Sequence, residues 1–187
     1  MGQIRLIGGM WRGRRISFPD APGLRPTPDR VRETLFNWLG QRLTGWVCLD
    51  LFAGTGALGF EAASRGAERV VFIERQRRLV DHLHRWAEAL DPTRLVIVGG
   101  DALQCALSWY EPVDLLFLDP PYHRGLLEQI SPLLDQLVRP DGAVYAEAER
   151  PVERLGQWQT IKAGRAGQVH FHLLRRLPDK DADGDHP

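Results

Sequence analysis

A carboxylate, two prolines and a tyrosine stand together at positions 119–122, directly after an apolar run at 113–118. Each proline fixes φ and lacks an N–H group, so Pro120 and Pro121 end the predicted strand and leave the chain extended. The Asp119 carboxylate and the free carbonyl oxygens then form a group of hydrogen-bond acceptors beside the Tyr122 ring. At the carboxyl edge of a parallel sheet, where ligands bind, this group suits a flat substrate with an amino group, such as a nucleobase.

A glycine-rich turn follows a second apolar run, at residues 47–52, and leads into a predicted helix. A strand, a glycine turn and a helix in this order are typical of nucleotide-binding sites. Gly54 and Gly56 permit a tight turn and the close approach of a ligand, and Gly59 permits close packing of the helix on the strand. The pattern G-x-G-x-x-G alone fits a nicotinamide enzyme as well as other classes.

Acidic residues near the predicted strand ends narrow this choice. Asp50 precedes the glycines at a position that is usually apolar in dinucleotide-binding proteins, and Glu74 ends the next strand, 69–73. A third acid, Asp101, follows the strand at 95–98. Glu74 lies about where the ribose-binding acid of a dinucleotide fold would lie, but Asp50 and Asp101 argue against a nicotinamide enzyme.

The order of these motifs is similar to that of class I S-adenosylmethionine-dependent methyltransferases. The Asp-Pro-Pro-Tyr element resembles that of members that methylate exocyclic amines of bases. Residues 5–14 and 25–37 resemble the RNA small-subunit methyltransferase D family, which methylates the N2 amine of one guanine in bacterial 16S ribosomal RNA. The resemblance covers roughly residues 5–176.

The resemblance implies S-adenosylmethionine as the cofactor, bound near a set of loop and strand-end residues. These are Asp50, Phe52, Ala53, Gly54, Gly56, Glu74, Asp101, Ala102 and Asp119. Glu74 would accept hydrogen bonds from both ribose hydroxyls, Asp101 would accept one from the adenine amino group, and the Ala102 N–H would donate to the ring. Each acid also has a structural alternative: Glu74 could pair with a nearby arginine, Asp101 could cap the following helix, and Asp50 could bind loop N–H groups.

The expected catalytic residues are Asp119, Pro120 and Tyr122. The lone pair of an aromatic amine is delocalised into the ring, so the amine is a poor nucleophile. If the Asp119 carboxylate and the Pro120 carbonyl accept its two N–H protons, the nitrogen can pyramidalise and face the methyl group. Tyr122 would stack on a base that has been turned out of the RNA.

The N-terminal part of the chain is basic, although the formal net charge of the whole protein is zero. Residues 1–44 hold eight arginines and three acids, a net charge of +5, with Trp11 and Phe18 between the arginines. Such a segment suits contact with RNA phosphates. The expected RNA-binding residues are Arg12, Arg14, Arg15, Arg30, Arg32 and Tyr122. The alternative is that this chain simply uses arginine in place of lysine almost everywhere.

The alternation of predicted strands and helices predicts an α/β fold with a parallel, doubly wound sheet, preceded by a small β-arm at 3–18 and a helix. The resemblance implies that the sheet is Rossmann-like, seven-stranded and mostly parallel, with one antiparallel strand. Thr27 is the expected N-cap of that helix, 28–39, and Gly40 its stop. Further helices are expected at 57–65, 77–90, 102–108 and 126–138. Strands are expected at 113–118 and 143–148, and a hairpin at 158–161 and 169–175.

The 187 residues predict a single methyltransferase domain, 1–177. Within it, 1–44 would be an RNA-contacting arm and helix, 45–177 the cofactor-binding and catalytic core, and 178–187 a disordered tail. The start of the sequence lacks a signal peptide's apolar core, and no apolar run could span a bilayer, so we expect a cytoplasmic protein without a membrane partner. The two cysteines predict neither a disulfide framework nor a metal site.

The resemblance implies transfer of a methyl group to guanine N2 of 16S ribosomal RNA, naked or within an assembling small subunit, and we expect a monomer. An adenine-N6 methyltransferase of DNA or RNA is the first alternative, because Asp-Pro-Pro-Tyr does not distinguish the two amines. A nicotinamide oxidoreductase would leave Asp50, Asp101 and the prolines unexplained. A non-enzymatic RNA-binding module would leave the cofactor motifs without a purpose.

Overall fold

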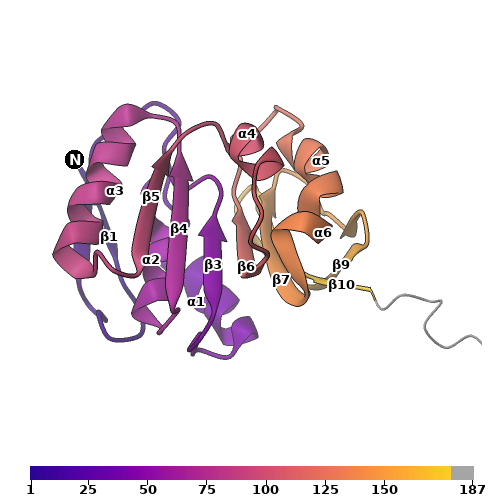
Figure 1. The fold of residues 1–187 in the computed structure, drawn as a ribbon, viewed down its shortest axis with the longest axis horizontal. Coiled ribbons are helices and arrows are strands. Elements are labelled where there is room, and N and C mark those ends of the chain that lie inside the picture. The colour runs from indigo at the N-terminus through magenta and orange to yellow at the C-terminus, as the bar shows by residue number, and fades with distance from the viewer. Residues whose placement is uncertain (178–187) are drawn as a thin grey trace, which may run out of the picture.

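The computed structural model describes residues 1–177, and its centre is one sheet with helices packed on both faces (Figure 1). The sheet order is β5-β4-β3-β6-β7-β10-β9-β8. Its strands are β3 (Val47–Asp50), β4 (Arg69–Glu74), β5 (Leu95–Gly99), β6 (Val113–Leu118), β7 (Val138–Ala148), β8 (Arg154–Leu155), β9 (Trp158–Ala166) and β10 (Val169–Arg176). Strands β5, β4, β3, β6 and β7 are parallel, and β10 pairs antiparallel with both β7 and β9. The predicted Rossmann-like class is confirmed, although the two-residue β8 brings the sheet to eight strands instead of seven.

The helices fall into two layers. They are α1 (Asp29–Leu39), α2 (Ala57–Ser64), α3 (Arg77–Leu90), α4 (Ala102–Leu107), α5 (Leu126–Ile130) and α6 (Leu134–Leu137), with a 3-10 turn η1 (Ser131–Leu133) between the last two. Apolar residues of α1, α2 and α3 form one core cluster with one face of the sheet. Residues of α4, α5 and α6 form the other cluster, and Figure 1 shows these three helices gathered beside β6 and β7.

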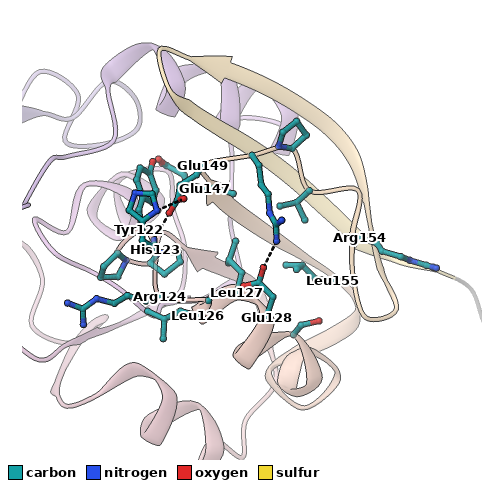
Figure 2. A pocket seen from close by; sticks show the side chains of 18 of the residues that line it. Tyr122, His123, Arg124, Leu126, Leu127, Glu128, Glu147, Glu149, Arg154 and Leu155 are labelled. Atoms are coloured by element: carbon teal, nitrogen blue, oxygen red, sulfur yellow. Dashed lines mark hydrogen bonds and ion pairs between the residues drawn. The ribbon is translucent and has the colours of Figure 1, made fainter.

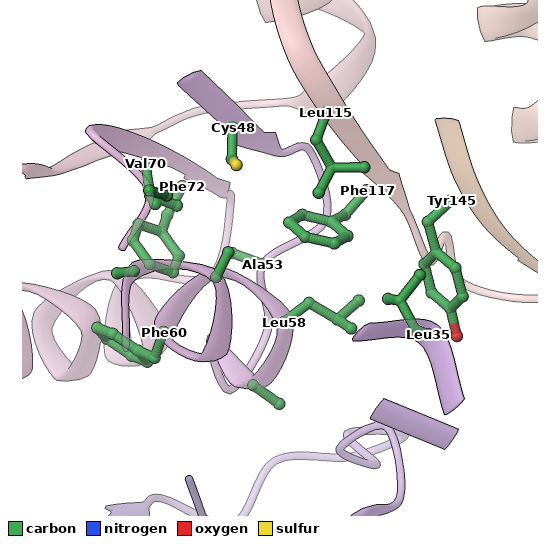
Figure 3. Packing of buried hydrophobic residues seen from close by; sticks show 14 of the residues in the cluster. Leu35, Cys48, Ala53, Leu58, Phe60, Val70, Phe72, Leu115, Phe117 and Tyr145 are labelled. Atoms are coloured by element: carbon green, nitrogen blue, oxygen red, sulfur yellow. The ribbon is translucent and has the colours of Figure 1, made fainter. Parts of the chain in front are cut away.

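The first core cluster is rich in aromatic side chains (Figure 3). The rings of Phe60 and Phe72 lie 4.8 Å apart and join α2 to β4. The rings of Phe117 and Tyr145 lie 6.3 Å apart on neighbouring strands. Such pairs add to the burial of apolar area because the ring edges and faces attract each other. The packing fixes the strand ends that carry the polar residues of the site.

The N-terminal segment is a two-stranded hairpin, β1 (Gly2–Arg5) and β2 (Arg15–Phe18), followed by a proline-rich connector and α1. The predicted helix stop at Gly40 is confirmed, because this glycine has φ 95° and ends α1. The predicted cap is wrong: α1 begins after Pro28 without a side-chain cap. The Thr27 hydroxyl instead donates a hydrogen bond to the Glu147 carboxylate, 2.9 Å away and 120 residues along the chain.

The predicted helix at 126–138 is broken into α5, η1 and α6. Pro132 lies in the 3-10 turn, where a proline cannot donate the hydrogen bond that a continuous helix would need. The expected strand at 143–148 begins earlier, at Val138. The predicted disorder of 178–187 lies outside the described residues. Within residues 1–177 no helix is long and apolar enough to cross a membrane.

Candidate functional site

Four carboxylates gather at one edge of the sheet. Asp50 and Glu74 are the last residues of β3 and β4, and Asp119 directly follows β6. Glu147 lies one residue before the end of β7. Because these four strands are parallel neighbours, their carboxyl ends lie together, at the edge where α/β sheets bind ligands.

The glycine turn after β3 is held by Glu74. The Gly54 N–H donates to Oε2 of Glu74 over 3.0 Å, and the Gln76 N–H donates to Oε1 over 2.7 Å. Gly54 and Gly56 have positive φ values of 51° and 78°, which glycine adopts without steric cost. Each carboxylate oxygen keeps a further lone pair, so Glu74 can still accept hydrogen bonds from a ligand.

The third glycine has the packing role that its spacing predicts. A Cβ atom at Gly59 would lie 2.2 Å from the ring of Phe72, so only glycine lets α2 approach β4 this closely. The Gly59 N–H also donates to Oδ2 of the buried Asp50 over 3.1 Å. The structural alternative for Asp50, binding an N–H group of the turn, is therefore present. Burial raises the pKa of Asp50 to about 7.

Asp101 caps α4. Its Oδ1 accepts hydrogen bonds from the N–H groups of Leu103 and Gln104, over 3.0 and 3.2 Å. This is the N-cap alternative, and it uses one oxygen of an exposed carboxylate, so a contact with adenine stays a prediction. The remaining expected cofactor residues lie beside it or in the turn: Ala102 is buried at the start of α4, Phe52 is half-buried, and the Ala53 N–H donates to the Ile73 carbonyl over 2.9 Å.

Asp119 and Glu147 form a pair across neighbouring strands. Leu118 of β6 lies in register with Ala146 of β7, so the residue after each, Asp119 and Glu147, projects at the same level. Burial raises the pKa of Asp119 well above its ordinary value, and the charges of Glu147 and then Asp50 raise it further. Burial also raises the pKa of Glu147, against the lowering effect of its hydrogen bonds from Tyr145 and Thr27.

The sequence analysis did not find Glu147. Its side chain is 4% exposed, and its Oε1 accepts hydrogen bonds from Thr27 Oγ1 over 2.9 Å and from Tyr145 Oη over 2.8 Å. The available signal was an acid within the apolar run of β7, since buried acids are rare unless they are paired or bound. That signal says nothing about the partner Thr27, which only the fold supplies.

A cavity of about 740 Å³ opens beside the Asp-Pro-Pro-Tyr element, between residues 120–128 and the chain after β7. Figure 2 shows Tyr122, His123, Glu147 and Glu149 together on one side of it, with Leu155 on the other. The Tyr122 side chain is 37% exposed, and its partial burial, followed by the nearby charge of Asp119, raises its pKa to about 12. His123 has a positive φ of 60° and its Nδ1 lies 2.8 Å from Oε2 of Glu149. The cavity therefore offers one neutral ring and several acceptors.

Four of the five predicted RNA-binding arginines are exposed: Arg12, Arg14, Arg15 and Arg30. Arg14 lies over the ring of Trp86, with its guanidinium carbon 6.0 Å from the ring centre. These exposed side chains are accessible to phosphates, and RNA contact by them stays a prediction.

Arg32 lies inside the protein, which contradicts the prediction that it contacts RNA. Its side chain is fully buried and forms an ion pair with the equally buried Glu61 at 3.1 Å. It also donates to the carbonyl oxygens of Thr27 and Arg5, over 3.2 and 2.9 Å. This guanidinium is fully engaged inside the protein, where it joins the connector and β1 to α2.

Among residues 1–177, no group of three or more His, Cys, Asp or Glu side chains is arranged to hold a metal ion. His172, on β10, is buried and accepts a hydrogen bond from the Val152 N–H at Nε2 over 3.0 Å. Burial lowers the pKa of His172. Its side chain faces the interior of the protein.

Residues 4–175 match the protein family described as conserved hypothetical protein 95. The chain is 41% identical over 191 residues to ribosomal RNA small subunit methyltransferase D of Escherichia coli K12, an alignment that covers 98% of this chain and 96% of that protein. It is 37% identical over 182 residues to the protein of the same name from Haemophilus influenzae, with 93% and 94% covered. A solved structure from Escherichia coli, described as the methyltransferase yhhF, is similar with a TM-score of 0.85 and 40% identity, over 95% of this chain and 100% of that one. This chain therefore belongs to the ribosomal RNA small subunit methyltransferase D family, and it is a methyltransferase.

Proposed function

We propose that this protein transfers a methyl group from S-adenosylmethionine to the exocyclic N2 amine of one guanine in 16S ribosomal RNA. The observation that carries the proposal is the position of Asp119. Its carboxylate is half-buried at the end of β6, beside the cavity and the Tyr122 ring. Among residues 1–177 it accepts no hydrogen bond, so its acceptor capacity is available to a substrate amine.

The residues at the strand ends fit S-adenosylmethionine. The glycine turn has positive φ values that bring backbone close to a ligand, and Glu74 keeps lone pairs for ribose hydroxyls. Asp50 and Asp119 are carboxylates whose pKa values are raised by burial. A cationic group placed beside them would favour their charged forms, and S-adenosylmethionine carries both a sulfonium and an ammonium group.

When bound, the cofactor would supply an electrophilic methyl group. The residues of this chain would make the amine more nucleophilic and orient it toward that methyl group. Asp119 and the Pro120 carbonyl would accept hydrogen bonds from the two N–H groups of the amine, which frees the nitrogen lone pair for attack. The nitrogen would become cationic as it takes the methyl group and the bond from that carbon to the sulfonium sulfur breaks, leaving a neutral thioether. It would therefore lose a proton only afterwards, to Asp119 or to water. Tyr122, neutral at physiological pH because its pKa is about 12, would stack on the base.

The exposed arginines of the N-terminal segment support an RNA substrate. Arg12, Arg14 and Arg15 are exposed in the hairpin region, where they can neutralise phosphates without leaving a buried partner. The names of the relatives include ribosomal RNA of the small subunit, which agrees with this substrate class.

The test is transfer of a labelled methyl group from S-adenosylmethionine to 16S ribosomal RNA, naked and in small-subunit particles, from cells that lack the enzyme. Digestion of the RNA and separation of nucleosides by mass spectrometry then identifies the product. We expect N2-methylguanosine at a single position. Formation of N6-methyladenosine would favour the adenine alternative and contradict the proposal, and so would the absence of transfer to both forms of the RNA.

A further inference from the structure

The two carboxylate oxygens of Glu147 differ: in the part of the chain that the structure describes, Oε1 accepts hydrogen bonds from the protein and Oε2 does not. Both hydrogen bonds, from Thr27 and from Tyr145, end on Oε1. Within residues 1–177 no donor is hydrogen-bonded to Oε2. In the same part of the chain no fully enclosed side-chain oxygen lacks a partner, so Oε2 is not fully enclosed, and Glu147 is one of the residues that line the cavity. A side chain that is 4% exposed is thus fixed by two donors at Oε1 and keeps Oε2 available to a ligand in the cavity.

The free oxygen lies beside the acceptor proposed for the target amine. Asp119 and Glu147 project at the same level from adjacent parallel strands, and such strands lie about 4.8 Å apart. Pro120, Pro121 and Tyr122 line the same cavity as Glu147. A base whose amine reaches Asp119 therefore presents the neighbouring atom of its Watson–Crick edge to Glu147.

That neighbouring atom differs between the two purines. In guanine the N2 amine adjoins N1–H, which is a hydrogen-bond donor. In adenine the N6 amine adjoins N1 without a hydrogen, which is an acceptor. The hydrogen bonds from Tyr145 and Thr27 favour the ionised form of Glu147 against the effect of burial. An ionised carboxylate has no proton to donate, so it bonds the guanine edge and repels the lone pair of adenine N1. Enzymes that extrude a base recognise it by such contacts with its Watson–Crick edge.

We propose that Glu147 accepts the N1–H of the target guanine and thereby selects guanine over adenine. This inference rests on the proposed function and deepens it, since the Asp-Pro-Pro-Tyr element alone suits either amine. Thr27 and Tyr145 are positioning residues, because they hold Oε1 and so orient Oε2. Thr27 comes from the N-terminal segment, which links the choice of base to a part of the chain outside the glycine turn and the Asp-Pro-Pro-Tyr element.

The test uses 2-aminopurine, a base that keeps the 2-amino group but has a bare N1. Synthetic RNA would carry guanine or 2-aminopurine at the methylated position, and single-turnover rates would be measured for the wild-type enzyme and for Glu147→Gln. In the variant the amide oxygen can keep the hydrogen bonds of Thr27 and Tyr145, and its NH₂ group then faces the cavity. The NH₂ group can donate to the bare N1 of 2-aminopurine but opposes the N1–H of guanine.

We expect the wild-type enzyme to prefer guanine by about 10- to 100-fold, the range for one good base contact. Glu147→Gln should slow methylation of guanine by a similar factor and reduce or reverse the preference. The loss of O6 in 2-aminopurine is common to both enzymes and cancels in the ratio of preferences. Glu68→Gln is the control, because this exposed acid lies just before β4 and outside the cavity, so it should keep the wild-type preference.

Unchanged preference in a folded Glu147→Gln variant that binds S-adenosylmethionine normally would overturn the inference and leave guanine methylation standing. Failure of the proposed function has a different signature, since the wild-type enzyme would then form no N2-methylguanosine. If Glu147→Gln fails to fold, Tyr145→Phe supplies the second measurement. This variant removes one hydrogen bond to Oε1 and leaves the acceptor in place, so it should lower the preference partly; no change of preference would count against the proposal.

Discussion

The site has two halves, which differ in the hydrogen-bond donors that their carboxylates have. The glycine-turn half comprises the ends of β3, β4 and β5, and the proline-motif half comprises the ends of β6 and β7 with the cavity. In the first, Glu74 and Asp101 accept hydrogen bonds from backbone N–H groups within 20 residues of themselves. In the second, Glu147 is bound by Thr27, 120 residues away, and Asp119 has no donor among residues 1–177.

The difference shows where specificity can arise in this fold. Hydrogen bonds between nearby residues make the glycine-turn half a self-contained unit, which suits a cofactor that many enzymes share. The proline-motif half depends on the N-terminal segment, through Thr27 and through Arg32, whose Nε donates to the Thr27 carbonyl over 3.2 Å. A change in that segment can therefore alter the substrate side without touching the cofactor side.

The largest effect should come from Arg32→Ala. The substitution leaves the buried carboxylate of Glu61 without one of its two arginine partners and releases Thr27. Breaking a buried ion pair costs about 3–5 kcal/mol, measured as the free energy of unfolding in urea. Arg30→Ala, an exposed neighbour on the same helix, should change stability by less than about 0.5 kcal/mol. Equal changes in the free energy of unfolding for the two variants would contradict the structural role of Arg32.

Asp119→Ala should separate chemistry from cofactor binding. Loss of one preorganised contact to the reacting amine should lower the single-turnover rate by about 10²–10³-fold, because this contact strengthens as the nitrogen gains positive charge. S-adenosylmethionine affinity should fall far less than the rate does, since Glu74 and Asp101 are untouched. Asp119→Asn keeps one acceptor and should retain partial activity. A near-normal rate for Asp119→Ala would end the proposed role of this carboxylate.

Glu74→Ala should show the opposite pattern. Loss of charge-assisted hydrogen bonds to the ribose should weaken S-adenosylmethionine binding by about 1–3 kcal/mol, as measured by titration calorimetry. The affinity for RNA should be unchanged. Glu68→Ala, an exposed acid just before β4, is the control. Normal cofactor affinity in a folded Glu74→Ala protein would remove this residue from the ribose site.

The stability of the ligand-free protein should fall as the pH rises from about 4 to about 7. The pKa of Asp50 is 3.8 in its ordinary state and about 7 in the fold, so in this window the folded state holds a proton that the unfolded chain has released. The slope is at most about 1.4 kcal/mol per pH unit for one proton. Urea unfolding at several pH values should show this trend, and Asp50→Asn should flatten it. A slope that Asp50→Asn leaves intact would assign the trend to Asp119 and Glu147, whose pKa values are also raised.

The smallest effect should come from the exposed arginines. Replacing Arg12, Arg14 and Arg15 together with alanine should lower RNA affinity and flatten its dependence on salt by up to about 0.9 for each phosphate that is no longer neutralised. Cofactor affinity should not change. The matched control replaces Arg75, Arg77 and Arg78, which are exposed near the start of α3. If RNA affinity depends on salt in the same way for the wild type and both variants, these arginines do not contact RNA, and their number reflects only the general use of arginine in this chain.

Much of the glycine-turn half could be predicted from the sequence. Its strands, its turn and the packing role of Gly59 follow from residues that are close in the chain, and the structure confirms them. The helix at 77–90 and the strand at 113–118 agree with the structure to the residue. Local signals failed where a distant partner decided the outcome: Thr27 had the right chemistry for a helix cap, but a buried carboxylate on β7 took its hydroxyl.

By itself, the sequence determined the fold class, the order of the strand-end motifs and the position of Asp119 after β6, because apolar periodicity and glycine and proline geometry act over a few residues. Only the tertiary structure decided that Arg32 is buried, that Thr27 binds Glu147 and that Glu147 lies beside Asp119. The physical reason is that a buried charge or hydroxyl must find a partner wherever the packed chain offers one. That partner is chosen by the arrangement of strands and helices in space, which short-range patterns do not encode.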